Sequence, residues 1–166
     1  MSSTADGSAP TRDPVVLFQR IDPADPIARW CLGQYFAELS ERFEQGFDPA
    51  ISIPTDDDEL RPPRGVFVVA TLDGAPVACG CQKPVTPEIG YLKRMWVARS
   101  ARGLGLGRRT LAALESEARA LGFTTLRLET NRTLLEAIRL YRSSGYTEVS
   151  PFNDEPYAHH WFEKVL

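Results

Sequence analysis

The sequence has few cysteines, little histidine, no excess of positive charge and no long apolar run. Its three cysteines do not form a disulfide framework, and Cys79 and Cys81 lack the further ligands of a metal site, so we expect buried thiols in a reduced, cytoplasmic protein. A net charge of −3 gives no basic surface for nucleic acid. No apolar run approaches the roughly 18 residues that a membrane span needs.

Length and composition indicate one globular domain. Of the 166 residues, 43% are hydrophobic and 25% are charged, which suits a soluble chain with a sizeable core. The first residues are small and polar, without the apolar segment of a signal peptide. We therefore expect a disordered tail over residues 1–13 and a single domain over residues 14–166.

Hydrophobic periodicity predicts alternating strands and helices. Helical period runs from Trp30 to Phe43, from Leu111 to Leu121 and from Leu134 to Tyr141. Strand-like runs cover residues 15–21, 66–72, 76–82, 92–97, 124–130, 146–149 and 158–164. Asp73-Gly74 predicts a hairpin turn, Gly122 and Gly145 predict helix ends, and residues 83–90 predict a longer connection. This order predicts an α/β fold with a mixed, mostly antiparallel sheet and a crossover at its central strand.

An irregular segment, residues 46–64, contains the acidic run Asp56–Glu59. One interpretation is a solvated loop in which Thr55 or Asp56 caps a short helix. The other is that these acids attract a cationic amine.

The most informative stretch joins the strand ending at Val97 to a helix through Arg102-Gly-Leu-Gly-Leu-Gly107. Glycines adopt positive φ without a Cβ penalty, so successive backbone amides can converge on one point. The first amides of a helix lack internal partners and lie at the positive end of its dipole. This turn therefore predicts a site for a phosphorylated ligand, with arginines adding charge.

Two common phosphate-binding motifs do not match this turn. A P-loop requires Lys and Ser or Thr directly after its last glycine, whereas Arg108 and Arg109 follow Gly107. A dinucleotide fingerprint requires GxGxxG in the first strand–helix unit, whereas these glycines run GxGxG and too little chain follows them, although Glu129 lies near the acidic position of that motif.

The remaining pattern is Arg-x-x-Gly-x-Gly, filled by Arg102, Gly105 and Gly107. Together with the later block Leu140-Tyr-Arg-Ser-Ser-Gly-Tyr146, it resembles the GNAT family of acetyl-CoA-dependent N-acetyltransferases. The resemblance covers residues 64–166 well and the first third loosely. It implies an enzyme with acetyl-CoA as cosubstrate, a central sheet whose middle strands splay apart between flanking helices, and a possible pairing into homodimers.

The resemblance also implies where the cosubstrate binds. The turn and the start of its helix would hold the diphosphate, and the end of the central strand would pair with the pantetheine arm, with the Val97 amide or a near neighbour facing the thioester oxygen. The residues implied are Met95, Trp96, Val97, Arg102, Gly103, Leu104, Gly105, Leu106, Gly107, Arg108 and Arg109.

Tyr141 matches the family's tyrosine that donates a proton to the departing thiolate, a role that suits a phenol with a pKa of about 10. A packing role on the helix is the alternative. The base that deprotonates the amine stays open between Glu38, Glu88, Tyr91, Glu129, His159, His160 and a water chain. The family's asparagine seven residues before the tyrosine is replaced by Leu134, and Asn131 is only close in sequence.

The acceptor is expected to be a small-molecule amine or an amino-acid-like primary amine that accepts acetyl directly in a ternary complex. By resemblance, aromatic residues of the first helix wall its site, and the polar segment 151–160 forms a flap; packing is the alternative for both. The candidate residues are Tyr35, Phe36, Phe43, Asn153, Tyr157 and His160. Two other functions stay open: a non-catalytic acyl-CoA-binding regulatory module, and acetylation of protein N-termini or lysines.

Overall fold

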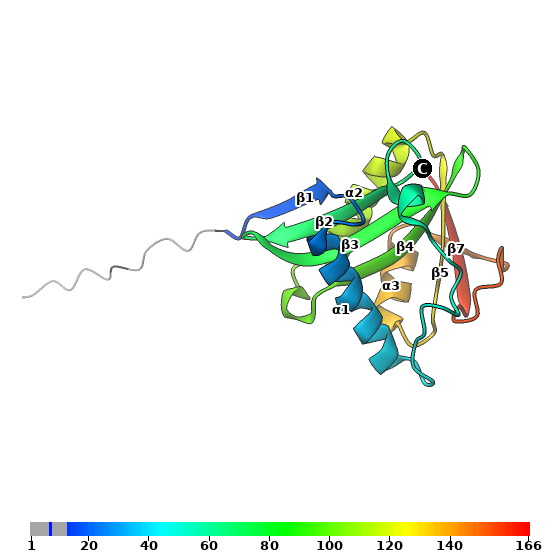
Figure 1. The fold of residues 1–166 in the computed structure, drawn as a ribbon, viewed down its shortest axis with the longest axis horizontal. Coiled ribbons are helices and arrows are strands. Elements are labelled where there is room, and N and C mark those ends of the chain that lie inside the picture. Colours follow the sequence, from blue (N-terminus) through cyan, green and yellow to red (C-terminus); the bar gives the residue numbers. More distant parts are fainter. Residues whose placement is uncertain (1–6, 8–12) are drawn as a thin grey trace, which may run out of the picture.

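The computed structural model describes residues 7 and 13–166, and one seven-stranded sheet organises them (Figure 1). The strand order is β1-β2-β3-β4-β5-β7-β6, and every neighbouring pair is antiparallel except β4 and β5. The strands are β1 (Val16–Arg20), β2 (Val66–Leu72), β3 (Ala75–Pro84), β4 (Ile89–Val97), β5 (Thr125–Thr130), β6 (Thr147–Val149) and β7 (His160–Val165). The expected mixed, mostly antiparallel α/β sheet is confirmed.

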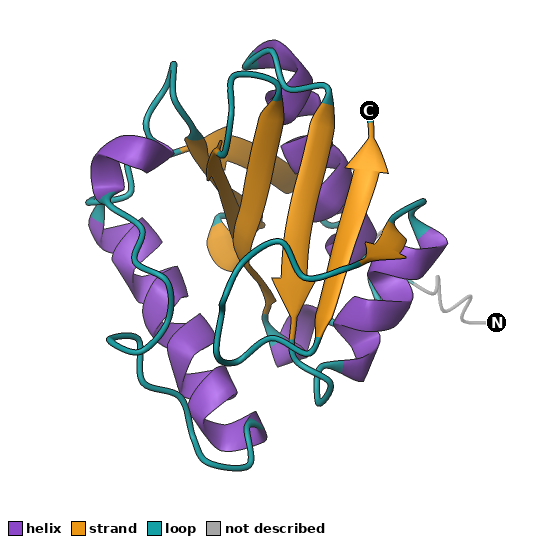
Figure 2. Cartoon of the chain, turned by 90° about the vertical axis from the view of Figure 1, so that its right-hand side faces the viewer, coloured by secondary structure: helices purple, strands orange, loops and turns teal. Residues whose placement is uncertain are grey.

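Three helices cover the sheet (Figure 2). The alternation of buried side chains along β2 shows which helices lie on which face. Val66 and Val68 pack in the core with α2 (Leu106–Ala120) and α3 (Leu135–Ser143). Phe67 and Val69 pack with α1 (Pro26–Arg42). Because successive strand residues point to opposite faces, α1 lies on one face and α2 and α3 lie on the other.

The parallel pair in the middle of the sheet separates early. Strands β4 and β5 pair only at Ile89–Thr125, Gly90–Leu126 and Tyr91–Arg127. A Cβ at Gly90 would lie 2.5 Å from the Phe123 ring, so glycine permits the close approach at the start. Beyond Tyr91, β4 has no partner on this side, and the amides that point toward β5 are left free for another acceptor. The expected splayed central strands are therefore confirmed.

A bulge bends β4 after this point. The register against β3 shifts between Cys79 and Cys81, and Arg94 has φ of 57°. A positive φ is costly for a residue with a side chain, and such strain concentrates at functional sites. The bulge turns the last part of β4 away from β5.

Several local predictions are confirmed and one segment is shorter than expected. The Asp73-Gly74 turn has φ values of 49° and 87°, and Gly122 and Gly145 have φ of 92° and 91° after their helices. The connection expected over residues 83–90 is shortened to residues 85–88, because β3 continues to Pro84 and β4 begins at Ile89. The three cysteines are free and buried, as expected.

The acidic run forms a solvated capped turn. Asp56 is the N-cap of a short 3-10 helix, η1 (Asp57–Leu60), and the Asp56 amide donates to Glu59 Oε1. Asp57 pairs with Arg29 and Asp58 with Arg61. These contacts support the capping interpretation rather than attraction of an amine.

The tail expected over residues 1–13 falls mostly on positions 1–6 and 8–12, which lie outside the described residues. No helix in the described part of the chain is both long and apolar enough to cross a membrane.

Candidate active site

The glycine turn carries the geometry that the sequence predicts for it. A short 3-10 helix, η2 (Arg99–Ala101), leads into it, and Gly105 is the N-cap of α2. Gly103 and Gly105 have φ of 91° and 69°, and a Cβ added at either would meet no atom within 4 Å. No side chain caps α2. The first amides of the helix therefore face open space, which suits an anionic ligand.

We call the cavity beside this turn the glycine cavity. It has a volume of about 370 Å³, and the described residues that line it include Gly103, Gly105 and Gly107 together with the end of β4. Of the predicted cofactor-binding residues, those in its wall are Met95, Trp96, Val97, Arg102, Gly103, Gly105, Leu106 and Gly107. The turn and the unpaired strand thus share one cavity.

The other three predicted cofactor residues are not among those that line the glycine cavity. Leu104 is exposed at the tip of the turn. Arg108 donates to the Ser143 hydroxyl at 3.0 Å, and the Arg109 guanidinium lies 5.7 Å from the centre of the Phe18 ring. Their contact with a phosphate stays a prediction.

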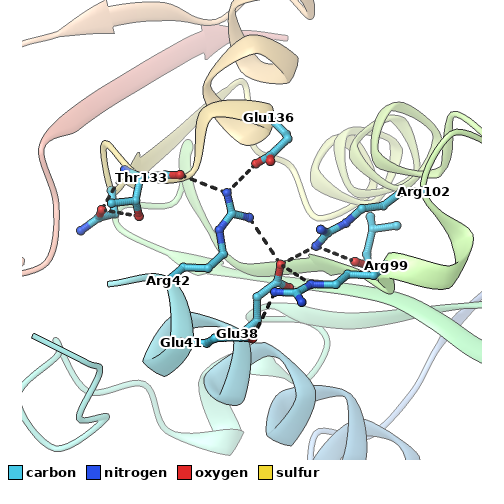
Figure 3. A network of polar contacts seen from close by, with 9 residues as sticks. Glu38, Glu41, Arg42, Arg99, Arg102, Thr133 and Glu136 are labelled. Carbon is cyan, nitrogen blue, oxygen red and sulfur yellow. Dashed lines mark hydrogen bonds and ion pairs between the residues drawn. The ribbon is translucent and has the colours of Figure 1, made fainter. Parts of the chain in front are cut away.

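A charged network closes the glycine cavity toward α1 (Figure 3). Glu38 accepts from Arg102 at 2.5 Å, and Arg42 lies 3.4 Å from the same carboxylate oxygen. Arg42 also reaches Glu136 at 2.8 Å and the Thr133 carbonyl at 3.0 Å. The network therefore ties α1 to the glycine turn and to the start of α3, and it engages the Glu38 carboxylate that was a candidate base.

A second cavity, the aromatic cavity, is lined by residues of both β4 and β5. Its volume is about 130 Å³, and its aromatic wall is formed by Tyr35, Phe36, Phe43, Phe47 and Tyr157. Phe47 stacks on Phe36 with ring centres 5.5 Å apart and lies 4.8 Å from the Tyr157 ring. Four predicted acceptor residues therefore meet here, while Phe47 was not predicted because it belongs to the irregular segment after α1.

The aromatic cavity also has charged groups of both signs. Lys93, Arg94, Glu129 and Glu155 line it. Lys93 Nζ donates to the Ile53 carbonyl and to Thr55, and burial lowers the pKa of Lys93 to about 8. The Arg94 guanidinium lies 5.6 Å from the centre of the Phe36 ring. Glu155 accepts from Ser52 and from the Ile53 amide, which holds the loop over the cavity.

The remaining two predicted acceptor residues do not line the aromatic cavity. Asn153 accepts from Trp161 Nε1 at 2.9 Å and donates to the Tyr91 hydroxyl at 3.2 Å. His160 lies 2.6 Å from Glu148 and stacks over Phe162. Asn153 thus contacts Tyr91 rather than the cavity, and His160 contacts Glu148 on β6.

The other candidate bases are scattered. Glu88 stays in the β3–β4 turn, where it accepts from Thr86. His159 accepts from the Arg132 amide, away from both cavities named above. Glu129 lines the aromatic cavity and accepts a hydrogen bond from Tyr91. Of the six side chains considered, Glu129 is thus the carboxylate that the fold brings into the aromatic cavity.

The two cavities meet at Tyr141. The residues shared by their walls are Tyr35, Leu39, Met95, Leu134, Ala137 and Tyr141. Tyr141 is 6% exposed, and burial is the main cause that raises its pKa above the usual value for a phenol. The phenol therefore stays protonated, so it can donate a hydrogen bond where groups bound in the two cavities would meet.

Comparisons with known proteins agree with this geometry. The family model described as "Acetyltransferase (GNAT) family" matches residues 31–146. An "IAA acetyltransferase" of Azospirillum brasilense is 43% identical over 94 residues, which is 55% of this chain and only 60% of that protein. An uncharacterized N-acetyltransferase of Schizosaccharomyces pombe is 31% identical, with 73% of this chain and 80% of that protein aligned.

Solved structures share the fold. A GNAT family acetyltransferase from Elizabethkingia anophelis with acetyl-CoA bound superposes with a TM-score of 0.60 at 15% identity, over 91% of this chain and 98% of that one.

Proposed function

Because the chain belongs to the GNAT family of acetyltransferases and is thus an acyltransferase with acetyl-CoA as cosubstrate, we propose that it acetylates the primary amine of a small, amino-acid-like acceptor. One observation carries this proposal: the glycine cavity and the aromatic cavity are separate but share the Tyr141 side chain. Two substrates can therefore be bound at once, with their reacting ends at Tyr141. This arrangement supports direct transfer in a ternary complex.

The glycine cavity has the chemistry that acetyl-CoA requires. The uncapped amides at the start of α2 would bind the diphosphate, and the free edge of β4 from Met95 to Val97 would pair with the amide groups of the pantetheine arm. The Val97 amide or a neighbour would stabilise charge on the thioester oxygen. Bound acetyl-CoA supplies the activated acetyl group.

Tyr141 would act on the sulfur. As the amine nitrogen forms its bond to the carbonyl carbon, the carbon–sulfur bond breaks and negative charge develops on sulfur. The Tyr141 hydroxyl donates a hydrogen bond to that charge and then its proton. Since burial keeps the phenol protonated, this donor is present over the whole accessible pH range.

The acceptor would bind in the aromatic cavity, and its size and charge describe a small molecule with a carboxylate. A volume of about 130 Å³ suits a compact molecule better than a peptide chain. Arg94 forms no ion pair with the described residues, and its guanidinium lies on Phe36 in the cavity wall. A guanidinium in this position suits an acceptor carboxylate. A cytoplasmic location and a homodimer remain predictions.

The test is thiol release from acetyl-CoA with matched pairs of acceptors, each pair an amino acid and the amine that lacks its carboxylate. We expect the amino acids to have kcat/KM at least about tenfold higher, which corresponds to about 1.4 kcal/mol. The Arg94→Gln variant should lose this preference and keep its activity on the simple amines. Turnover confined to peptide N-termini or lysines, or no turnover despite acetyl-CoA binding, would contradict the proposal.

A further inference from the structure

The Glu129 carboxylate is held at one oxygen and free at the other. The Tyr91 hydroxyl donates a hydrogen bond to Glu129 Oε1. Glu129 Oε2 is buried and has no hydrogen-bond partner among the described residues, while the side chain lines the aromatic cavity. A buried polar atom without a partner costs free energy, and a bound water, a ligand or a chemical role can offset that cost.

A chain of hydrogen bonds fixes the orientation of this carboxylate. Trp161 Nε1 donates to Asn153 Oδ1 at 2.9 Å, and Asn153 Nδ2 donates to the Tyr91 hydroxyl at 3.2 Å. Trp161 lies on β7 directly opposite Glu129 on β5, and Tyr91 lies on β4. Three strands and the connection before β7 thus hold Oε1 in place, and Oε2 is the carboxylate oxygen without a partner.

The Glu129 side chain is on the acceptor side of the site. Glu129 and Tyr141 line the same cavity, and the negative charge of Glu129 contributes to the raised pKa of Tyr141. Tyr141 also lines the glycine cavity, which Glu129 does not. An amine held in the aromatic cavity would therefore have Glu129 on its own side and the thioester on the other.

We propose that Glu129 is a catalytic residue that takes a proton from the acceptor ammonium group through Oε2, and that Tyr91, Asn153 and Trp161 are positioning residues for it. This assignment rests on the proposed function. An ammonium group has three N–H protons. One passes to Glu129 and then to solvent, one restores Tyr141 after that residue has protonated the sulfur, and one stays on the amide product.

The charges around Glu129 suit this role. Burial and, next, the Glu155 charge raise the pKa of Glu129 to about 8. The other titratable groups around it are Tyr91 and Lys93 from β4, Lys83 from β3, Tyr35 from α1 and Tyr141 from α3. A bound ammonium group would favour the ionised carboxylate. A base with a pKa near the working pH combines sufficient ionisation with strong proton affinity.

The experiment compares wild type with Glu129→Gln, which keeps the shape and still accepts from Tyr91. At pH 7.5 we expect kcat/KM for an ordinary primary amine to fall about 100-fold or more. In the wild type, kcat/KM should rise with pH through an inflection that belongs to Glu129. The Glu129→Gln variant should lack this inflection. With an analogue whose ammonium pKa lies below about 7, the amine is already neutral, so the loss should shrink to less than about tenfold.

Three further variants complete the test. Glu163→Gln, on β7 and paired with Arg127 at 2.8 Å outside both cavities, is the matched control and should keep activity within about twofold. Glu129→Asp keeps a carboxylate and should retain intermediate activity with the inflection, which covers the case that the glutamine variant fails to fold. Asn153→Ala should lower kcat less than Glu129→Gln and leave the inflection present but shifted.

Two results would overturn the assignment while leaving the proposed function intact. One is a Glu129→Gln enzyme with wild-type kcat/KM and an unchanged pH profile. The other is an equal loss on the ordinary and the low-pKa amine, which is the pattern of a packing role. A wild-type protein that binds acetyl-CoA but acetylates no amine would overturn both.

Discussion

Glu38 Oε1 lies 2.5 Å from a terminal nitrogen of Arg102 and so joins α1 to the glycine turn. The Glu38 side chain is 13% exposed and that of Arg102 is 38% exposed, so the pair is only partly screened by solvent. Arg102 also donates to the Val97 carbonyl at 3.3 Å. The pair therefore fixes the turn relative to the end of β4, on which the shape of the glycine cavity depends.

Replacing Glu38 should loosen the turn. We expect Glu38→Gln to lower the free energy of unfolding by about 1 kcal/mol and to raise the KM for acetyl-CoA about fivefold, because a less ordered turn must be ordered on binding. Urea titration and steady-state kinetics measure the two effects. Glu41→Gln is the control, since its pair with Arg99 is exposed on both sides and should be worth little. Equal behaviour of the two variants would show that the Glu38 network has no role in binding.

Gly105→Val should weaken acetyl-CoA binding by at least about 30-fold. Gly105 has φ of 69°, a conformation that costs a residue with a Cβ about 1–2 kcal/mol and a β-branched residue more. The new side chain would also project into space that is open for the ligand. Calorimetric titration with acetyl-CoA gives the affinity directly.

Gly33→Ala is the control for Gly105→Val. Gly33 lies within α1 with no atom within 4 Å of an added Cβ, so alanine there should stabilise the helix by up to about 1 kcal/mol and leave binding unchanged. Unaltered acetyl-CoA affinity in the Gly105→Val variant would show that the turn is not part of the binding site.

Tyr141→Phe should lower kcat by about 100-fold and change the KM of either substrate by less than about threefold. The variant keeps the ring that packs at 6.0 Å from Phe162 and at 5.8 Å from Tyr146, and it removes only the proton donor. Initial-rate kinetics with both substrates varied separates the two parameters. The reverse pattern, a raised KM with unchanged kcat, would assign Tyr141 to packing and binding.

Glu129 should also make stability depend on pH. Its folded pKa of about 8 lies above its unfolded value of 4.5, so between these values the folded state holds the proton more tightly. Its contribution to stability is thus fully present below pH 4.5 and is lost as the pH rises to 8. Glu129→Gln should remove this decrease in the free energy of unfolding. We expect the decrease to be on the order of 1–3 kcal/mol after allowing for partial exposure. Urea unfolding of both proteins between pH 5 and 8.5 gives the difference, and parallel curves would contradict it.

The features read correctly from the sequence are those encoded by neighbouring residues. The glycine turn at residues 103–107, the Asp73-Gly74 turn and the caps at Gly122 and Gly145 each need a backbone conformation that glycine favours. The strand from Val66 to Leu72 has the same bounds in the structure, because its continuous apolar run is typical of a strand buried on both faces.

Features that depend on distant residues could not be predicted. The unit of Tyr91, Glu129, Asn153 and Trp161 comes from four segments, and no spacing in the sequence relates them. The base was therefore left open among six side chains and a water chain. Arg94 faces the aromatic cavity because a bulge gives it positive φ, whereas nothing in its sequence neighbourhood suggests a bulge.

The most direct test of the account is a crystal structure of the protein with acetyl-CoA. We predict that the diphosphate binds to the backbone amides of residues 104–109 and that the thioester sulfur lies within hydrogen-bonding distance of the Tyr141 hydroxyl. A structure with the cosubstrate outside the glycine cavity, or with its sulfur directed away from Tyr141, would contradict the account.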